Sequence, residues 1–178
     1  NVNSQSNWEN ALKLVDPVAM ADYFLLNIYG ATWDWPNNNW VSARERSANG
    51  RYRFYVWDAE GAFGHPRRTG NNNSNKPVDF NTITQDLLSR TDSTSQMFQR
   101  LERWPEFRLL LADRIHKHFF HGGTLDDSSP AASHIKGVID TAISEFSPLL
   151  DERSNQAVDT EFWEYWTNSG SSRRSYLL

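Results

Sequence analysis

The sequence contains no cysteine, no long apolar run and no excess of basic residues. Without cysteine, disulfide bonds and thiolate metal sites are excluded. The net charge of −4 argues against nucleic acid as a partner, because proteins that bind nucleic acid present a basic face to the phosphates. No apolar stretch is long enough to cross a bilayer, so we expect no membrane span.

Aromatic side chains are abundant instead, with eight Trp, ten Phe and six Tyr among 178 residues. Such a load can fill a sizeable core. The length suits a single domain, 1–178. We expect an α+β fold that is predominantly helical and has one β-hairpin near the front of the chain.

A first helix is expected to begin at Asp16-Pro17, an N-cap followed by proline at the first helical position. It should run to about Tyr29 and end at Gly30. Apolar residues at helical spacing predict its buried face: Val18, Ala21, Phe24, Leu25 and Ile28. Asp22 lies elsewhere on this helix, and we expect it to be solvated or locally hydrogen-bonded.

Helical patterns fill the back half of the chain. They predict helices near 83–88, at 95–103, from Pro105 to about 121, from 129 to 146 and from about 160 to 166. Before them, residues 64–80 are polar and interrupted by Gly and Pro, which predicts a mobile surface loop. The histidines His116, His118 and His121 are expected to be ordinary core or surface residues, because a third zinc ligand is missing.

The stretch 31–64 carries polar residues at both ends and a predicted hairpin between them. Strands at about 40–44 and 52–57 flank Asn49-Gly50, a dipeptide that tolerates the positive φ angles of a tight turn. A hairpin returns the chain to where it began, so we expect Asp58 to lie close to Asn39 and Asp34. Oxygen ligands that meet from separate loops suit a hard cation such as Mg²⁺.

The order of these parts repeats that of kinase catalytic lobes: Asp34, Asn39 five residues later, a hairpin, and then Asp58 with a glycine-containing loop. In kinases the first Asp accepts the proton of the attacking hydroxyl, the Asn binds a metal ion and the last Asp chelates the magnesium on the nucleotide. Phosphoryl transfer depends on positioning and charge neutralisation, which these side chains supply.

Several motifs also resemble the spore-coat-protein-H (CotH) kinase family. They are DYFLLNIYG, WDWPNNNW, GRYRFYVWDAEGAFG and WPEFRLLLADRIHKHFF. The family has an Asp followed by an Asn-aromatic pair, a basic strand and a Trp-Asp-x-acid motif. These features correspond here to Asp34, Asn39-Trp40, residues 51–55 and residues 57–60.

The resemblance implies an atypical protein kinase that uses ATP and Mg²⁺ or Mn²⁺. It makes Asp34 the catalytic residue, Asn39 and Asp58 ligands of the metal and nucleotide, and Glu60 a metal contact where the family usually has Asp. It also implies a protein acceptor, in some members the kinase itself, and an exported, cell-surface or spore-coat setting. The nucleotide-gripping lobe of a kinase precedes its catalytic loop, so we expect residues 1–178 to be the C-terminal, catalytic lobe of a longer protein, inactive on its own.

Two other interpretations stay open. Four tryptophans surround the acidic residues, namely Trp33, Trp35, Trp40 and Trp57. Aromatic rings with carboxylates also describe a secreted carbohydrate-binding module, or a glycosidase that uses Asp34 and Asp58 as its pair. Asn39 argues against either kind of sugar site, because such a site has no special use for it. The other interpretation is a non-catalytic surface protein with a degenerate kinase fold, which Glu60 keeps open.

Overall fold

The computed structural model describes residues 5–59, 61–64, 76–77, 79–126, 141 and 144–145. Its elements, in chain order, are α1 (Gln5–Leu14), α2 (Pro17–Gly30), β1 (Trp40–Ala43), β2 (Arg53–Val56), the π-helical turn η1 (Ile83–Leu87), α3 (Ser93–Leu101) and α4 (Pro105–Phe119). The α+β class is confirmed at this level. The helices predicted at 129–146 and 160–166 lie outside the described residues, apart from isolated positions. Within the described part, no helix could span a membrane.

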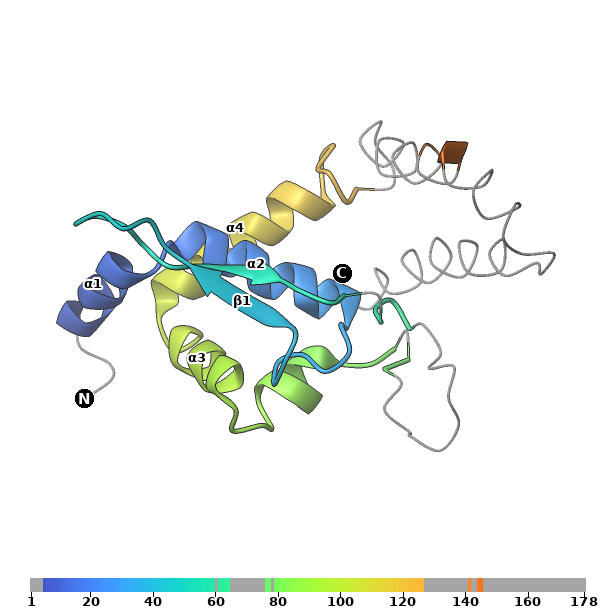
Figure 1. Cartoon of the computed structure of the whole chain (residues 1–178), viewed down its shortest axis with the longest axis horizontal. Coiled ribbons are helices and arrows are strands. Elements are labelled where there is room, and N and C mark those ends of the chain that lie inside the picture. Colours follow the sequence, from blue (N-terminus) through green and yellow to red (C-terminus); the bar gives the residue numbers. More distant parts are fainter. Residues whose placement is uncertain are drawn as a thin grey trace.

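Helix α2 is the central element of the described chain, with β2 packed against it on one side and α4 on the other (Figure 1). The Asp16 carboxylate accepts hydrogen bonds of 3.1 Å from the backbone N–H groups of Val18 and Ala19, which caps the helix as predicted. The helix ends at Gly30, also as predicted. The prediction that Val18 is buried is wrong, because its side chain is 42% exposed.

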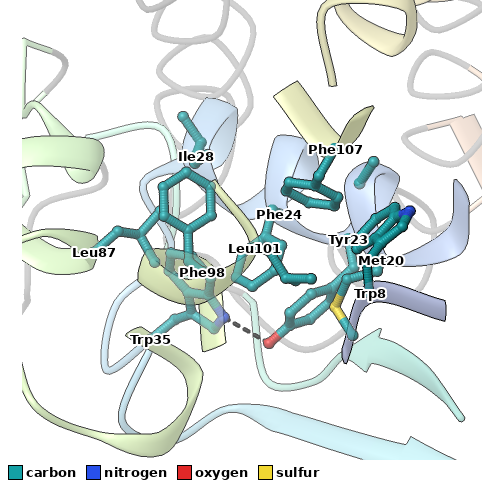
Figure 2. Close-up of a cluster of buried hydrophobic side chains, with 11 residues drawn as sticks. Trp8, Met20, Tyr23, Phe24, Ile28, Trp35, Leu87, Phe98, Leu101 and Phe107 are labelled. Carbon is teal, nitrogen blue, oxygen red and sulfur yellow. Dashed lines mark hydrogen bonds between the residues drawn. The ribbon is translucent and has the colours of Figure 1, made fainter. Parts of the chain in front are cut away.

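A cluster of aromatic rings joins α2 to α3 and to the loop that follows α2 (Figure 2). The Phe24 ring lies 5.0 Å from that of Phe98 and 6.2 Å from that of Trp35, both in edge-on arrangements. The indole N–H of Trp35 donates a 2.7 Å hydrogen bond to the Tyr23 hydroxyl, and burial raises the pKa of Tyr23 to about 12. Trp35 therefore anchors the loop that carries Asp34 to the core.

Helix α4 begins at Pro105, as predicted, and is joined to α2 by an ion pair. The Arg114 guanidinium donates two hydrogen bonds, of 2.6 and 2.7 Å, to the two carboxylate oxygens of Asp22. The Nε2 atom of His118 lies 3.3 Å from the same carboxylate. The expectation of a solvated or locally bonded Asp22 is wrong, because its partners come from a helix about ninety positions away in sequence.

The hairpin exists, but its turn differs from the prediction. Residues 44–52 connect the two strands, so the connection is longer than a two-residue turn. The N–H of Gly50 donates to the Ser47 carbonyl at 3.2 Å, and neither Asn49 nor Gly50 has a positive φ angle. A Cβ atom at position 50 would lie 2.1 Å from the Glu45 carbonyl oxygen. Glycine is needed here for close backbone approach.

Candidate functional site

The two polar ends of the hairpin meet where its strands leave the sheet. The ladder ends with Trp40 opposite Val56. Immediately beyond it, the N–H of Trp57 donates to the Asn39 carbonyl at 3.3 Å. This pairing brings Asp58 beside Asn39, as the hairpin argument requires.

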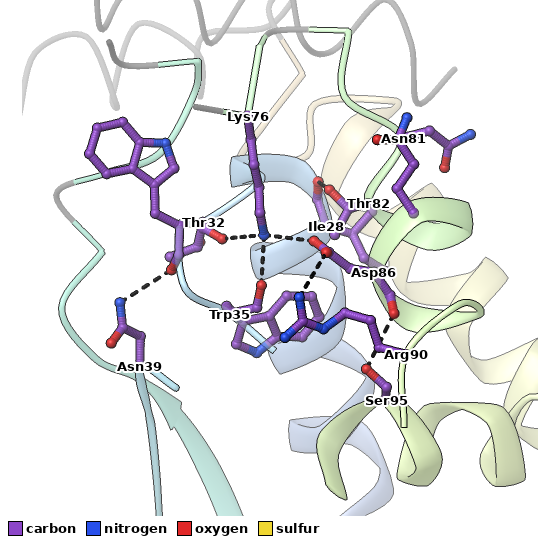
Figure 3. A network of polar contacts seen from close by, with 12 residues as sticks. Ile28, Thr32, Trp35, Asn39, Lys76, Asn81, Thr82, Asp86, Arg90 and Ser95 are labelled. Atoms are coloured by element: carbon purple, nitrogen blue, oxygen red, sulfur yellow. Dashed lines mark hydrogen bonds and ion pairs between the residues drawn. The ribbon is translucent and has the colours of Figure 1, made fainter. Parts of the chain in front are cut away.

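The side chain of Asn39 links both acidic segments. Its Nδ2 donates to the Trp33 carbonyl at 3.2 Å and to the Asp58 carbonyl at 3.1 Å. Figure 3 draws the first of these bonds as a dashed line from the Asn39 amide nitrogen. Because Trp33 directly precedes Asp34, one amide group holds together the backbones that carry both carboxylates, and its Oδ1 is left to face another group.

All three residues have left-handed backbone conformations. The φ angles are 56° for Asp34, 59° for Asn39 and 54° for Asp58. Asn and Asp adopt this conformation more readily than other non-glycine residues, yet it still costs free energy and is concentrated at functional sites. Asp34 and Asp58 are exposed and Asn39 is half-buried, so a ligand can reach all three. Glu60, the fourth predicted site residue, lies outside the described residues.

A second set of contacts joins the segment after Asp58 to the loop before Asp34. The N–H of Trp33 donates to the Gly61 carbonyl at 2.7 Å, and the N–H of Phe63 donates to the Gly30 carbonyl at 2.6 Å. A Cβ atom at Gly61 would lie 2.2 Å from ring carbons of Trp33. Glycine at position 61 therefore lets the two segments touch.

Lys76 is buried beneath the loop that carries Asp34, with 8% of its surface exposed. Its ammonium group donates to the Thr32 carbonyl at 2.7 Å, the Trp35 carbonyl at 2.6 Å and Oδ2 of Asp86 at 2.6 Å (Figure 3). These bonds use all three of its N–H groups. The prediction of a surface loop over residues 64–80 is therefore wrong at this position, and sequence reasoning missed Lys76.

The four tryptophans of the site do not share one exposed platform. Trp35 is buried in the core, Trp33 and Trp40 are half-buried, and the Trp57 side chain is 63% exposed. The Trp40 ring packs at 5.7 Å against Phe54. A sugar would therefore meet a single open indole ring here, which gives little support to a carbohydrate-binding interpretation.

The three histidines at the end of α4 do not face one common point, as the ligands of a metal ion would. The rings of His116 and His121 lie 4.9 Å apart, while His118 faces Asp22. Among the residues that the structure describes, no three His, Cys, Asp or Glu side chains gather closely enough to hold a metal ion.

A cation at the hairpin ends would therefore depend on Asn39 and on ligands from a bound molecule as well as on carboxylates.

The chain also matches a known protein family. Residues 1–144 match the family model described as CotH kinase protein. The matched part includes α1 to α4, both ends of the hairpin and Lys76. No curated protein and no solved structure gave a match.

Proposed function

The chain belongs to the CotH kinase family, and on that premise we propose that it is the kinase-like catalytic lobe of an atypical protein kinase. The reaction is transfer of the γ-phosphate of ATP to a hydroxyl group on a protein acceptor, with Mg²⁺ or Mn²⁺ as the cation. The observation that best supports this is the Asn39 amide, which ties the backbone before Asp34 to the backbone of Asp58.

In this proposal Asp34 orients the acceptor hydroxyl and takes its proton as the oxygen attacks the γ-phosphorus and ADP leaves. Its exposure suits a group that must meet a protein substrate. Asn39, through Oδ1, and Asp58 hold the cation, which neutralises charge on the phosphates. Mg²⁺ is commonly bound by one or two carboxylates together with substrate phosphates and water, so this small set of oxygen donors fits it.

The proposal also covers Glu60, the nucleotide-gripping lobe and the location of the protein. Glu60 is proposed as an additional metal contact with a longer arm than Asp. A nucleotide-gripping lobe is proposed elsewhere in the full-length protein. An exported, cell-surface or spore-coat location is proposed from the family resemblance.

The test is phosphate transfer from labelled ATP by the full-length protein, to itself and to a generic protein acceptor, with Mg²⁺, Mn²⁺ or chelator. Asp34→Asn and Asp58→Asn are compared with Asp113→Asn, a matched change at an exposed position of α4. We expect a loss of about 10²–10⁴-fold for Asp34→Asn, the range for removal of a general base, and no detectable transfer for Asp58→Asn. Asp113→Asn should match the wild type.

Retained transfer in both site variants would overturn the assignment of these residues. A folded wild-type protein that binds ATP with Mn²⁺ but transfers no phosphate would instead support a degenerate kinase fold. Absence of both binding and transfer would overturn the kinase proposal itself.

A further inference from the structure

We infer that Lys76 is a positioning residue, which holds the loop bearing Asp34 in its working conformation. The inference rests on the proposed function, because it assigns Lys76 a role in the same site. Lys76 is separated from Asp34 by more than forty positions in sequence, yet its ammonium group reaches the backbone on both sides of Asp34.

The contacts enclose the position of Asp34. Thr32 lies two residues before it and Trp35 one residue after it, and both give their carbonyl oxygens to the Lys76 ammonium, at 2.7 and 2.6 Å. Thr32 and Trp35 are themselves buried, at 3% and 1% exposure. Without Lys76 these carbonyls would lose a strong donor in a place that water does not easily reach, and the loop would have to move to satisfy them.

The charge of Lys76 is balanced inside the protein. Asp86, which is 4% exposed, accepts the third hydrogen bond at 2.6 Å, and the Phe80 ring centroid lies 5.3 Å from the ammonium. The Ser95 hydroxyl donates to the Asp86 backbone carbonyl at 3.3 Å, which ties η1 to α3. The chain of contacts thus runs from α3 through η1 to the loop that carries Asp34.

A buried ion pair is weak evidence for stability, because the desolvation of both charges offsets their attraction. The Lys76 ammonium also holds the carbonyl groups of Thr32 and Trp35 in place, which an apolar pair of side chains could not do. The left-handed conformation of Asp34, φ 56°, lies between those carbonyls. Strained conformations persist only where the surroundings enforce them, and Lys76 supplies that enforcement.

The experiment separates positioning from stability with two variants of the full-length protein. Lys76→Met removes the lysine partner of Asp86 and leaves it the 4.0 Å ion pair with Arg90. Lys76→Met/Asp86→Leu removes both buried charges together. Lys117→Met, at an exposed position of α4, is the matched control. Each protein is measured by urea unfolding, by amide hydrogen exchange of residues 32–39 and by kcat and KM for ATP.

We expect Lys76→Met to unfold at lower urea concentration and the double variant to regain much of that loss. In the double variant, exchange over 32–39 should still be about ten-fold faster than in the wild type, since two carbonyls lack their donor. Its kcat should fall about 10–100-fold, the effect of a small misplacement, while KM for ATP stays within about three-fold.

If a stable double variant has the same amide exchange rates over 32–39 and the same kcat as the wild type, the inference is overturned. Lys76 then contributes to stability alone. If the wild-type protein transfers no phosphate, there is no kcat to compare, and amide exchange over 32–39 alone decides the positioning role. If the double variant does not fold, Lys76→Arg replaces it. Its planar fork cannot place three donors as the ammonium does, so faster exchange is again expected, and unchanged exchange overturns the inference.

Discussion

The side-chain amide of Asn39 donates a 3.1 Å hydrogen bond to the backbone carbonyl of Asp58, nineteen residues further along the chain. The same nitrogen donates at 3.2 Å to the Trp33 carbonyl. Both partners are acceptors, so the link needs a donor at position 39. Asp, which has nearly the same shape, has no N–H to give when ionised.

This relationship predicts the effect of Asn39→Asp. The variant adds a negative charge beside the proposed cation but loses the two bonds that hold the site, so cation affinity should fall by about ten-fold or more, as it does when groups that orient metal ligands are removed. The measurement is terbium luminescence sensitised by the exposed Trp57, repeated with Mn²⁺ competition. Asn38→Asp is the matched control, because it adds the same charge one residue away. Tighter binding by Asn39→Asp than by Asn38→Asp would contradict the prediction.

Gly61→Ala should destabilise the protein through a clash with Trp33. The added Cβ would lie 2.2 Å from ring carbons of Trp33, and overpacking of this kind costs about 1–3 kcal/mol. Urea unfolding measures the cost. The control is the same substitution combined with Trp33→Val, which removes the ring. If the cost of Gly61→Ala is the same with and without the indole, the clash is not its cause.

The ion pair between Asp22 and Arg114 should hold α2 to α4. Both side chains are partly exposed, at 35% and 16%. We therefore expect Arg114→Met to lower the free energy of unfolding by about 1–2 kcal/mol, between the values for exposed and buried pairs. A double-mutant cycle with Asp22→Asn isolates the pairwise part. Strictly additive losses would mean that the two side chains do not interact in solution.

The N-cap of α2 makes stability depend on pH. The hydrogen bond from the Ala19 N–H, together with the Arg53 guanidinium, holds the pKa of Asp16 below its usual value. A carboxyl group with a lower pKa in the folded state stabilises the protein above its unfolded-state pKa, about 3.9, and this stabilisation is lost as pH falls through the folded-state pKa.

Asp16→Asn keeps a good cap but removes the charge. It should therefore be less stable than the wild type by about 0.3–1 kcal/mol at pH 7, the range for a charge at a helix N-terminus. The difference should shrink as the pH is lowered from 5 to 2, measured by urea unfolding across that range. A difference that stays constant with pH would show that the charge of Asp16 is not its source.

Local signals predicted the local structure well. Asp16, Pro17 and Gly30 mark both ends of α2, and Pro105 marks the start of α4, because caps and proline act through their own backbone neighbours. The return of the hairpin was also predictable, and with it the approach of Asp58 to Asn39. The role of Gly50 was predicted wrongly. A glycine can serve either a positive φ angle or a close backbone approach, and the Asn49-Gly50 dipeptide does not distinguish the two.

The contacts that hold the site together could not be predicted in this way. Lys76 reaches Thr32 and Trp35 from a polar segment whose composition indicates a surface loop. Asp22 pairs with Arg114 only because α4 packs across α2. Each contact depends on how helices and loops pack against one another. No local pattern in a single sequence indicates that packing.

The left-handed backbone at Asp34, Asn39 and Asp58 restricts which residues evolution or an engineer can place there. Glycine, asparagine and aspartate accept that conformation most easily, whereas a longer acid such as glutamate meets a backbone penalty in addition to its extra length. A saturation library selected only for folding should therefore retain these three residue types at all three positions. A library selected for phosphate transfer should narrow to one residue at each position, because function accepts only part of what the backbone allows.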